Sequence, residues 1–537
     1  MTRTPDNKRI SLNPFISAGQ PLLMLSGGTP AKDSGLIKHR LPSGAASETG
    51  YTMKLYALLE KLQTKLADTE VAGVTDDTRA MRENMVFVCI RGAKYDGHDA
   101  AEAMLRQGAL LVITEHPLGL GDREITVSNT RQTYGDLCAA WYGHPERKMR
   151  FVGVTGTNGK TTTATLIKEM LKKTGQRVGL IGTVQYEIGD EILPSPNTTP
   201  LTDAYFALLA KMAEAKIETV VMEVSSFGLE QYRIGPTHFA AAVFTNLTQD
   251  HLDVHGTMEN YYLAKRMLFD RCDYAVINAN DDYGKRLYQE ISCEKSTYGI
   301  RQNASERFDA MADEISLSTE GTKFTLHLHG ETIPMSMRMT GMFNVSNAVA
   351  AIAVGRKIGI PMTVMNELLL DYTGVRGRCE VIPTALDFTV ICDYAHTPDA
   401  LEKTLASLRE CTVGRLIAVF GCGGNRDAAK RPKMARAAAS LADFVMVTSD
   451  NPRDEDPLAI IHDILEGLKD SDVPYQTEPD RAEAIYLAMK QAKTGDVVLL
   501  AGKGHEDYQI IAGGVHLHMD ERELVADAAK RIFAEKM

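Results

Sequence analysis

The chain has 537 residues, a formal net charge of −11 and 8 cysteines. Its length predicts about two to four domains, and its negative charge argues against a general nucleic-acid binder. No apolar run reaches the roughly 18 residues of a membrane span, and the scattered cysteines form no CxxC pair, which is typical of free thiols in a reducing compartment. We expect a soluble, cytoplasmic protein with no nucleic-acid partner and no membrane insertion.

The first 52 residues differ in composition from the rest of the chain. They are rich in Gly, Ser, Pro and Thr and have no helical or strand period, which predicts either a flexible extension or an over-called start. An amphipathic stretch, Met53-Lys-Leu-Tyr-Ala-Leu-Leu-Glu-Lys-Leu, opens at Met53. The functional body is therefore expected to begin near Met53.

From there to the C-terminus, short apolar runs alternate with helical patterns, which predicts an α/β fold with parallel strands. The expected strands are 86–90, 110–114, 151–154, 178–181, 219–222, 241–245, 274–278, 390–393, 416–420, 444–448 and 497–501. One segment, 323–329, alternates apolar and polar residues and predicts a half-exposed antiparallel strand. A metal site at His327 and His329 is the alternative, but a solvated strand face is favoured there, as it is for His516 and His518.

The strongest local signal is Phe151-Val-Gly-Val-Thr-Gly-Thr-Asn-Gly-Lys-Thr-Thr-Thr163, in which a strand runs through a Gly-rich turn into a helix. Gly156 and Gly159 allow backbone N–H groups to face phosphate oxygens, Lys160 reaches the terminal phosphates, and Thr161 offers a hydroxyl to Mg²⁺. Val154 occupies the first Gly position of the strict P-loop pattern, so an ordinary Gly-rich turn stays as the alternative.

Acidic and His residues follow two later strands, where ligands bind in open α/β sheets. Glu223 ends one strand, and Asp250-His251-Leu-Asp253-Val-His255 follows another. Their convergence on the phosphate loop predicts metal ions around the phosphates. The alternatives are a buried salt bridge for Glu223 and a structural His for His251.

Taken in order, these motifs resemble those of the Mur ligases of peptidoglycan synthesis. The matching segments are Gly156-Thr-Asn-Gly-Lys-Thr-Thr162, Glu223-Val-Ser-Ser226, Asn246-Leu-Thr-Gln-Asp-His-Leu-Asp253, Ala264-Lys265, Gly341-Met-Phe-Asn-Val-Ser-Asn347, Gly377-Arg-Cys-Glu380 and Asp393-Tyr-Ala-His-Thr-Pro398. After the extension at 1–52, the resemblance implies three domains: a UDP-sugar domain at 53–148, a central P-loop ATPase domain at 149–375 and a Rossmann-like amino-acid domain at 376–537.

Within the family, the chain resembles ligases that add a diamino acid to UDP-N-acetylmuramoyl-L-alanyl-D-glutamate. Asp77-Thr-Arg79 and Gly92-Ala-Lys-Tyr-Asp-Gly-His98 match the uridine-binding region. Residues implied to bind the UDP-sugar dipeptide are Thr78, Asn197, Thr198, Thr199, Ser225, Gln231 and Arg233. Two positions depart from the family pattern: Phe227 stands where His is common, which puts the fit around the D-glutamyl part in question, and Thr248 replaces a frequent Ser.

The resemblance also implies the acceptor, meso-diaminopimelate. Residues implied to bind it are Arg426, Asp450, Asn451, Pro452, Arg453, Gly502 and Glu506. Arg453 and Arg426 suit the second carboxylate of this amino acid, which lysine lacks, and Glu506 suits an ammonium. Without the resemblance, Asp450–Arg453 would be interpreted as a turn at a strand end with Arg453 in solvent.

The implied reaction transfers the ATP γ-phosphoryl group to the D-glutamate γ-carboxylate, after which the amine attacks the acyl phosphate. The implied ATP-binding residues are Gly156, Thr157, Asn158, Gly159, Lys160, Thr161, Thr162, Asn344, Arg378 and Asp393, with Asn347 and His396 nearby. The implied catalytic residues are Lys160, Glu223, His251 and Lys265. The implied Mg²⁺ ligands are Thr161, Glu223, His251 and Lys265.

For Lys265, the helical pattern and the family resemblance give different predictions. It lies on a helix predicted at 258–269, where the pattern alone favours a solvated lysine, whereas the resemblance implies a CO₂-derived carbamate on this side chain. Thr397 and Pro398 are expected to cap and begin the helix after Asp393.

Three other functions stay open from the sequence. A lysine-adding homologue differs only in the acceptor pocket, a folylpolyglutamate synthase shares the ligase architecture, and a P-loop regulatory NTPase would hydrolyse ATP without an amino acid. The chain is expected to act as a monomer.

Overall fold

The computed structural model describes residues 53–54, 69–92, 95–318 and 321–536. The extension predicted at 1–52 and most of the amphipathic stretch after Met53 lie outside these residues. The first two residues of that stretch form strand β1 (Met53–Lys54), which pairs antiparallel with β2 (Glu70–Val71). Among the described residues, no helix has both the length and the apolar character needed to cross a bilayer.

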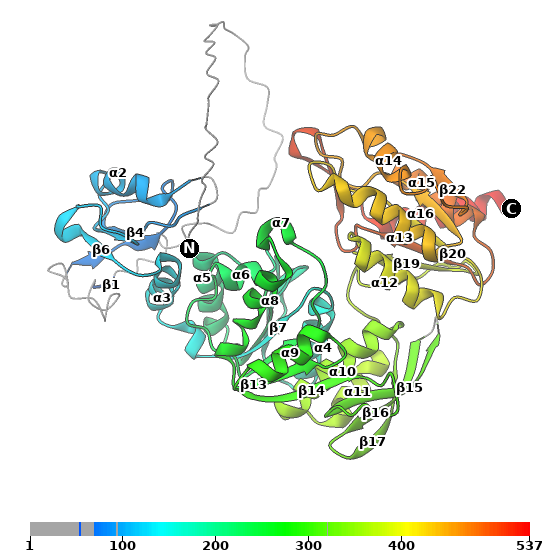
Figure 1. Ribbon diagram of the computed structural model, residues 1–537, viewed down its shortest axis with the longest axis horizontal. Coiled ribbons are helices and arrows are strands. Elements are labelled where there is room, and N and C mark those ends of the chain that lie inside the picture. Colours follow the sequence, from blue (N-terminus) through cyan, green and yellow to red (C-terminus); the bar gives the residue numbers. More distant parts are fainter. Residues whose placement is uncertain (1–52, 55–68, 93–94, 319–320, 537) are drawn as a thin grey trace, which may run out of the picture. The chain divides into compact units, whose positions relative to one another are not determined.

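Three larger sheets occupy successive stretches of the chain, and several of their strands are labelled in Figure 1. The first is a parallel four-stranded sheet in the order β3-β4-β5-β6. Its strands are β3 (Gly73–Thr75), β4 (Met85–Val88), β5 (Leu111–Thr114) and β6 (Glu124–Thr126). The helices of this stretch are η2 (Gly97–Ala100), α2 (Ala101–Arg106), η3 (Gly121–Arg123), α3 (Thr130–Trp141) and η4 (Pro145–Arg147).

The second sheet has 11 strands in the order β10-β9-β8-β11-β7-β12-β13-β14-β15-β16-β17. Its middle, from β8 to β15, is parallel, and antiparallel strands extend it at both edges. The strands are β7 (Arg150–Thr155), β8 (Val178–Ile181), β9 (Gln185–Ile188), β10 (Glu191–Pro194), β11 (Thr219–Glu223), β12 (Ala241–Phe244), β13 (Tyr274–Asn278), β14 (Glu294–Ile300), β15 (Ala310–Ser318), β16 (Gly321–Leu328) and β17 (Glu331–Met337).

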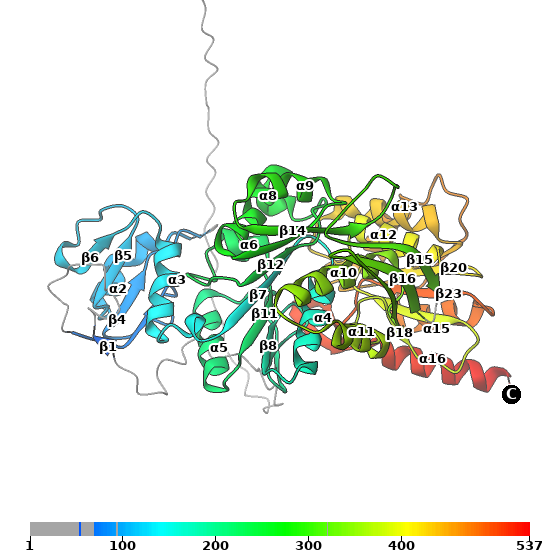
Figure 2. The same cartoon turned by 90° about the horizontal axis from the view of Figure 1, so that it is seen from below.

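Helices cover both faces of this sheet, so its middle strands are buried on both sides, as continuous apolar runs require. One face packs under α4, α10 and α11, and α5 and α8 lie on the other side (Figure 2). The helices are α4 (Lys160–Lys173), α5 (Thr202–Glu214), α6 (Ser226–Glu230), α7 (Leu252–His255), α8 (Met258–Arg266), η5 (Phe269–Arg271), α9 (Asp282–Glu290), α10 (Met342–Lys357) and α11 (Met362–Asp371).

The third sheet has six strands in the order β18-β19-β23-β20-β21-β22. Alternate residues of β20 enter two cores: Ala418 packs with α12, α13 and α14, and Val419 packs with α15 and α16. The strands are β18 (Glu380–Ile382), β19 (Thr389–Asp393), β20 (Leu416–Phe420), β21 (Phe444–Val447), β22 (Tyr475–Thr477) and β23 (Val497–Ala501), followed by the hairpin β24 (Tyr508–Ile511) and β25 (Val515–His518). The helices are α12 (Pro398–Arg409), η6 (Ala428–Lys430), α13 (Arg431–Leu441), α14 (Pro457–Leu465), α15 (Arg481–Gln491), η7 (Ala512–Gly514) and α16 (Glu521–Lys536).

The predicted α/β class is confirmed, and each predicted strand is present with ends that differ by at most two residues. The antiparallel strand predicted at 323–329 is β16, whose Phe324, Leu326 and Leu328 are buried while the residues between them are not. His327 binds Asp313 across the sheet at 2.9 Å. The histidines of β25 are exposed, so both pairs lie on solvated faces.

Candidate active site

The phosphate loop follows β7 and runs into α4, and two of its glycines are required by close contacts. Gly156 and Gly159 have φ of 149° and 84°. A Cβ on Gly156 would overlap the hydroxyl of Thr245, and a Cβ on Gly159 would overlap the amide of Asn347. Only glycine fits both the backbone conformation and the space.

The loop is held by the chain that follows β12. The N–H of Thr157 donates to the carbonyl of Asn246 at 2.8 Å, and the N–H of Asn158 donates to the Asn246 side-chain oxygen at 2.9 Å. Lys160 Nζ donates to the carbonyls of Gly156 and Thr157 at 2.9 and 2.8 Å, so its amino group lies over the loop. A lysine over a Gly-rich loop at a helix N-terminus forms an anion site.

Glu223, at the end of β11, lies beside this loop and is buried. It accepts hydrogen bonds from the Thr161 hydroxyl at 2.9 Å, the Thr183 N–H at 2.8 Å and the Thr183 hydroxyl at 3.0 Å. These partners are hydroxyl and amide groups, so the alternative of a salt bridge is wrong for the described chain. A carboxylate and a hydroxyl this close are the hard oxygen ligands that Mg²⁺ prefers.

The sequence analysis did not identify Thr183 as a site residue, although it follows the end of β8, at the edge of the sheet where ligands bind. Its hydroxyl is 3.0 Å from that of Thr198 and thereby joins Glu223 to the predicted dipeptide residues. Thr199 donates to the Glu223 carbonyl at 3.1 Å and accepts from the Ser225 N–H at 3.0 Å. The carbonyl of Asn197, next to Thr198, accepts from Tyr186. The structure therefore brings the predicted phosphate and dipeptide residues together.

Arg233 extends this group, because its Nη1 donates to the Thr199 carbonyl at 3.1 Å. Its guanidinium lies 4.8 Å from the centre of the exposed Phe227 ring. Burial lowers the pKa of Arg233. Phe227 thus provides an aromatic face for the arginine at the position where the family pattern has His.

Two predicted dipeptide residues are not joined to this group. Gln231 follows the last residue of α6, two residues before Arg233, and its described hydrogen bonds are made by its backbone. Thr78 follows β3 in the first sheet, and no described side-chain hydrogen bond links it to Thr199 or Arg233. Within the matched motif Gly92–His98, residues 93 and 94 lie outside the described part of the chain.

Lys265, on α8, is buried against the phosphate loop. Its Nζ donates to the Gly156 carbonyl at 2.8 Å and lies 4.4 Å from the centre of the Tyr261 ring. The expectation of a solvated lysine from the helical pattern is therefore wrong, and α8 ends at Arg266 rather than at 269. Burial, followed by the nearby Lys160 charge, lowers the pKa of Lys265 well below its ordinary value.

His251 immediately precedes the short helix α7 and has a left-handed conformation, with φ of 53°. Its side chain is exposed and lies 3.4 Å from Asp250. Its ring is edge-on to Tyr261, the same ring that Lys265 contacts. Because the exposed imidazole contacts Asp250 and Tyr261, the alternative of a structural His stays open. The side chain of Asp253 is outside the described set.

The residues after 376 that were predicted to bind the nucleotide form a second group. Arg378 Nη2 lies 3.4 Å from the Thr161 hydroxyl, and its guanidinium lies over the Tyr394 ring. Asp393 is buried and accepts from the N–H groups of Cys379 and Ala395 at 2.7 and 2.8 Å; burial raises its pKa.

Asn344 and Asn347 lie one turn apart on α10 and connect to α4. Asn347 donates to the Asn344 side-chain oxygen at 3.4 Å and accepts from the Thr163 hydroxyl at 3.3 Å. The predicted start of the helix after Asp393 is confirmed, because the Thr397 side chain caps α12 and Pro398 is its first residue.

The predicted acceptor residues come from three loops that follow β20, β21 and β23. Arg453 has φ of 52°, is half-buried and donates to the carbonyl of Gly424 at 2.9 Å, so the expectation of a solvent-exposed side chain is wrong. A Cβ on Gly423 would meet both Arg453 and Arg426, which therefore lie on the same glycine turn.

The other acceptor residues surround a lysine that the sequence reasoning passed over. Lys503 is fully buried and donates to Asn451 and Glu506 at 2.8 Å each, with Asp450 at 3.7 Å. Gly502 faces the Asp450 carboxylate, and Asp450 leads through Asn451 to Pro452, whose carbonyl faces Gly424. Lys503 lies between the predicted residues Gly502 and Glu506, but the sequence does not say which of these neighbouring side chains is buried.

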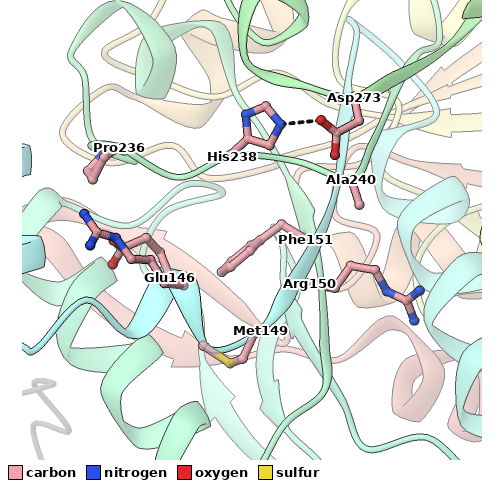
Figure 3. A pocket seen from close by; sticks show the side chains of 9 residues that line it. Glu146, Met149, Arg150, Phe151, Pro236, His238, Ala240 and Asp273 are labelled. Carbon is pink, nitrogen blue, oxygen red and sulfur yellow. Dashed lines mark hydrogen bonds and ion pairs between the residues drawn. The ribbon is translucent and has the colours of Figure 1, made fainter. Parts of the chain in front are cut away.

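A cavity of about 410 Å³ lies at the other end of β7 from the phosphate loop. Figure 3 shows His238 and Asp273 facing each other at its side, joined at 2.8 Å. It is lined by Glu146, Arg147, Met149, Arg150, Phe151, Pro236, His238, Ala240 and Asp273. None of the predicted site residues lines it.

Comparison with known proteins gives matches along the whole described body. Residues 70–142 match the model of the Mur ligase family catalytic domain, 154–355 the Mur ligase middle domain, and 377–504 the Mur ligase glutamate ligase domain.

Two curated relatives and one solved structure extend these matches. The chain is 41% identical to the UDP-N-acetylmuramoyl-L-alanyl-D-glutamate–2,6-diaminopimelate ligase 1 of Clostridium acetobutylicum, over 90% of this chain and 100% of the relative. It is 40% identical to the UDP-N-acetylmuramoyl-L-alanyl-D-glutamate–2,6-diaminopimelate ligase of Bacillus velezensis, over 88% of this chain and 97% of the relative. A solved structure of a UDP-N-acetylmuramoyl-L-alanyl-D-glutamate–2,6-diaminopimelate ligase aligns with a TM-score of 0.66 at 32% identity, over 91% of this chain and 100% of that one.

Proposed function

The chain belongs to the Mur ligase family, and we propose that it adds meso-diaminopimelate to the D-glutamate γ-carboxylate of UDP-N-acetylmuramoyl-L-alanyl-D-glutamate. The reaction consumes ATP and gives the UDP-linked tripeptide, ADP and phosphate. The observation that carries the proposal is the likeness of nearly the whole chain to ligases named for this reaction, at 41% identity. We place it in the cytoplasm, where ATP and UDP-linked precursors are available, and expect a monomer.

The first step is transfer of the ATP γ-phosphoryl group to the γ-carboxylate. A carboxylate oxygen forms a bond to phosphorus, and the bond to the ADP oxygen breaks. Such transfer depends on positioning and charge neutralisation. Lys160 and the loop N–H groups are suited to hold the phosphates, because they line the start of α4. The contact between Thr183 and Thr198 supports a dipeptide carboxylate close to Glu223.

Mg²⁺ fits the oxygen atoms beside the loop, and we assign its binding to Thr161, Glu223, His251 and Lys265. When bound, it neutralises negative charge on the transferred phosphoryl group. A lysine whose pKa is lowered by burial has the neutral amine that reacts with CO₂. A carbamate on Lys265 would replace a positive charge with an oxygen ligand for the metal.

In the second step an amine of the acceptor attacks the acyl carbon. The new C–N bond forms, the C–O bond to phosphate breaks, and the amine loses its proton. Arg426 and Arg453 support recognition of the distal carboxylate, and Glu506 suits the distal ammonium. We assign Arg378 and Asp393 to nucleotide binding. We propose three domains, at 53–148 for the UDP-sugar, at 149–375 for ATP and at 376–537 for the amino acid.

The test uses purified protein with ATP, Mg²⁺ and UDP-N-acetylmuramoyl-L-alanyl-D-glutamate, and either meso-diaminopimelate or L-lysine. We expect phosphate release and the tripeptide mass with meso-diaminopimelate only. In Arg453→Met, kcat/KM for meso-diaminopimelate should fall at least about 100-fold, because the distal carboxylate of the acceptor loses its guanidinium partner. Preference of the wild type for lysine would favour the lysine-adding alternative, and no product with either would contradict the proposal.

A further inference from the structure

Lys503 is fully buried, with 0% of its side chain exposed. Burying an amino group is costly unless hydrogen-bond acceptors replace the lost water. Lys503 has two at 2.8 Å, Asn451 Oδ1 and Glu506 Oε2, which come from different loops of the acceptor site. Its position therefore joins these loops.

This contact fixes the orientation of Glu506. Oε2 of Glu506 accepts from Lys503 and also from Asn451 Nδ2 at 3.0 Å. Over the part of the chain that the structure describes, Oε1 accepts no hydrogen bond, and the Glu506 side chain is 15% exposed. One carboxylate oxygen is thus held by the protein, and the other is available to a ligand.

Lys503 also lies beside a second acidic group. Asp450 Oδ1 lies 3.7 Å from Nζ, and Glu506 Oε2 lies 2.8 Å from the same atom. Without the lysine, two carboxylates would share a largely desolvated site, where like charges disfavour ionisation. A protonated or turned Glu506 would be a poor partner for an ammonium.

We propose that Lys503 is a positioning residue for the acceptor, which holds Asn451 and Glu506 so that the free oxygen of Glu506 receives the distal ammonium of the diamino acid. The inference rests on the proposed function and deepens it. It assigns to Lys503 the discrimination between acceptors with and without a distal amine.

The test compares meso-diaminopimelate with 2-aminopimelate, which has the same chain and both carboxylates but no distal amine. In Lys503→Met, kcat/KM for meso-diaminopimelate should fall at least about 30-fold, mostly through KM, because a charge-assisted contact is lost. The value for 2-aminopimelate should change less than about three-fold, so the selectivity collapses. KM for ATP and for the UDP-linked dipeptide should stay unchanged.

Lys168 provides the matched control. It is also buried, and its amino group lies 3.1 Å from Glu187, but it belongs to α4, away from the acceptor loops. Lys168→Met should lower Tm and leave the acceptor selectivity intact. Equal loss for both acceptors in Lys503→Met, or unchanged selectivity, would overturn the inference.

A double variant keeps the test decisive if Lys503→Met folds poorly. Lys503→Met combined with Glu506→Gln removes the unpaired carboxylate, and should have the selectivity of Glu506→Gln alone, because the two residues act as one unit. A further loss in the double variant would contradict the inference. Failure of the wild type to make the tripeptide would instead overturn the proposed function, so the two failures are distinguishable.

Discussion

The amino group of Lys265 donates a 2.8 Å hydrogen bond to the carbonyl of Gly156, so a buried lysine contacts the phosphate loop itself. Lys160 donates to the same carbonyl at 2.9 Å. Burial, followed by repulsion from the Lys160 charge, lowers the pKa of Lys265. This arrangement connects α8 to the phosphate loop.

Lys265→Ala should lower kcat at least about 100-fold, since the proposed metal site would lose a ligand. A short carboxylate such as acetate should restore part of the activity by filling the vacated space with oxygen. Lys265→Arg keeps a cation, accepts no CO₂ and should not be rescued. Full activity of Lys265→Ala without added carboxylate would remove the role assigned to this lysine.

Gly156→Ala should raise KM for ATP at least about ten-fold and destabilise the protein, because its Cβ would overlap Thr245. Gly175→Ala is the matched control. Gly175 also has a positive φ, of 87°, but its Cβ would meet nothing within 4 Å. This control should lower the free energy of unfolding by about 1 kcal/mol and leave KM for ATP unchanged. Equal effects of the two substitutions on KM would contradict the close contact as the cause.

Acid should destabilise the protein through His505. Its Nδ1 is buried without a partner among the described residues, and burial, followed by the Arg378 charge, lowers its pKa from 6.5 to about 4. Between these values the unfolded chain binds a proton that the folded chain does not. The free energy of unfolding therefore falls as pH decreases from 6.5 to 4, by up to about 3 kcal/mol from this group.

Urea unfolding of the wild type and His505→Gln at pH 7 and pH 4.5 measures this contribution. The variant should lose less stability between the two pH values. His518→Gln should lose more stability than the wild type between pH 7 and pH 4.5. Glu523 raises the pKa of His518, so the wild type has this stabilising contribution at low pH and the variant does not. Identical acid dependence of the wild type and His505→Gln would count against the buried neutral imidazole.

Arg481 and Glu521 form a fully buried ion pair at 2.7 Å behind the acceptor loops. Arg481 also donates to the carbonyls of Ser449 and Ala501, the residues before Asp450 and Gly502. Arg481→Met should destabilise the protein by about 3–5 kcal/mol, because Glu521 is left buried and unpaired.

The exposed pair of Arg531 and Glu483, at 2.8 Å, is the matched control. Arg531→Met should cost less than about 1 kcal/mol. Thermal unfolding of both variants compares the two costs. Similar shifts in Tm would contradict the importance of burial.

The sequence predicted the fold well where local patterns determine structure. The apolar run 416–420 forms a strand, as expected for a sheet that helices cover on both faces. Thr397 and Pro398 mark the start of α12, because helix capping is a local interaction. The ends of strands were predicted less well, since hydrogen bonds to neighbouring strands decide them.

The sequence predicted site residues that belong to recognisable motifs, but it did not predict how their side chains pack. The burial of Lys265 depends on α8 packing against a loop more than 100 residues earlier in the chain, which helical periodicity does not contain. Thr183 and Lys503 are ordinary residues in sequence, and their importance appears only from the groups around them. Tertiary contacts of this kind override local preference.

Isotope transfer tests the central claim most directly. The substrate would be UDP-N-acetylmuramoyl-L-alanyl-D-glutamate with ¹⁸O in both oxygens of the γ-carboxylate, incubated with ATP, Mg²⁺ and meso-diaminopimelate and analysed by mass spectrometry. The account predicts the tripeptide with one ¹⁸O in its new amide and one ¹⁸O in each released phosphate, because the carboxylate oxygen that attacks phosphorus leaves with it. Tripeptide formed with unlabelled phosphate, or phosphate released without tripeptide, would contradict an acyl-phosphate ligase.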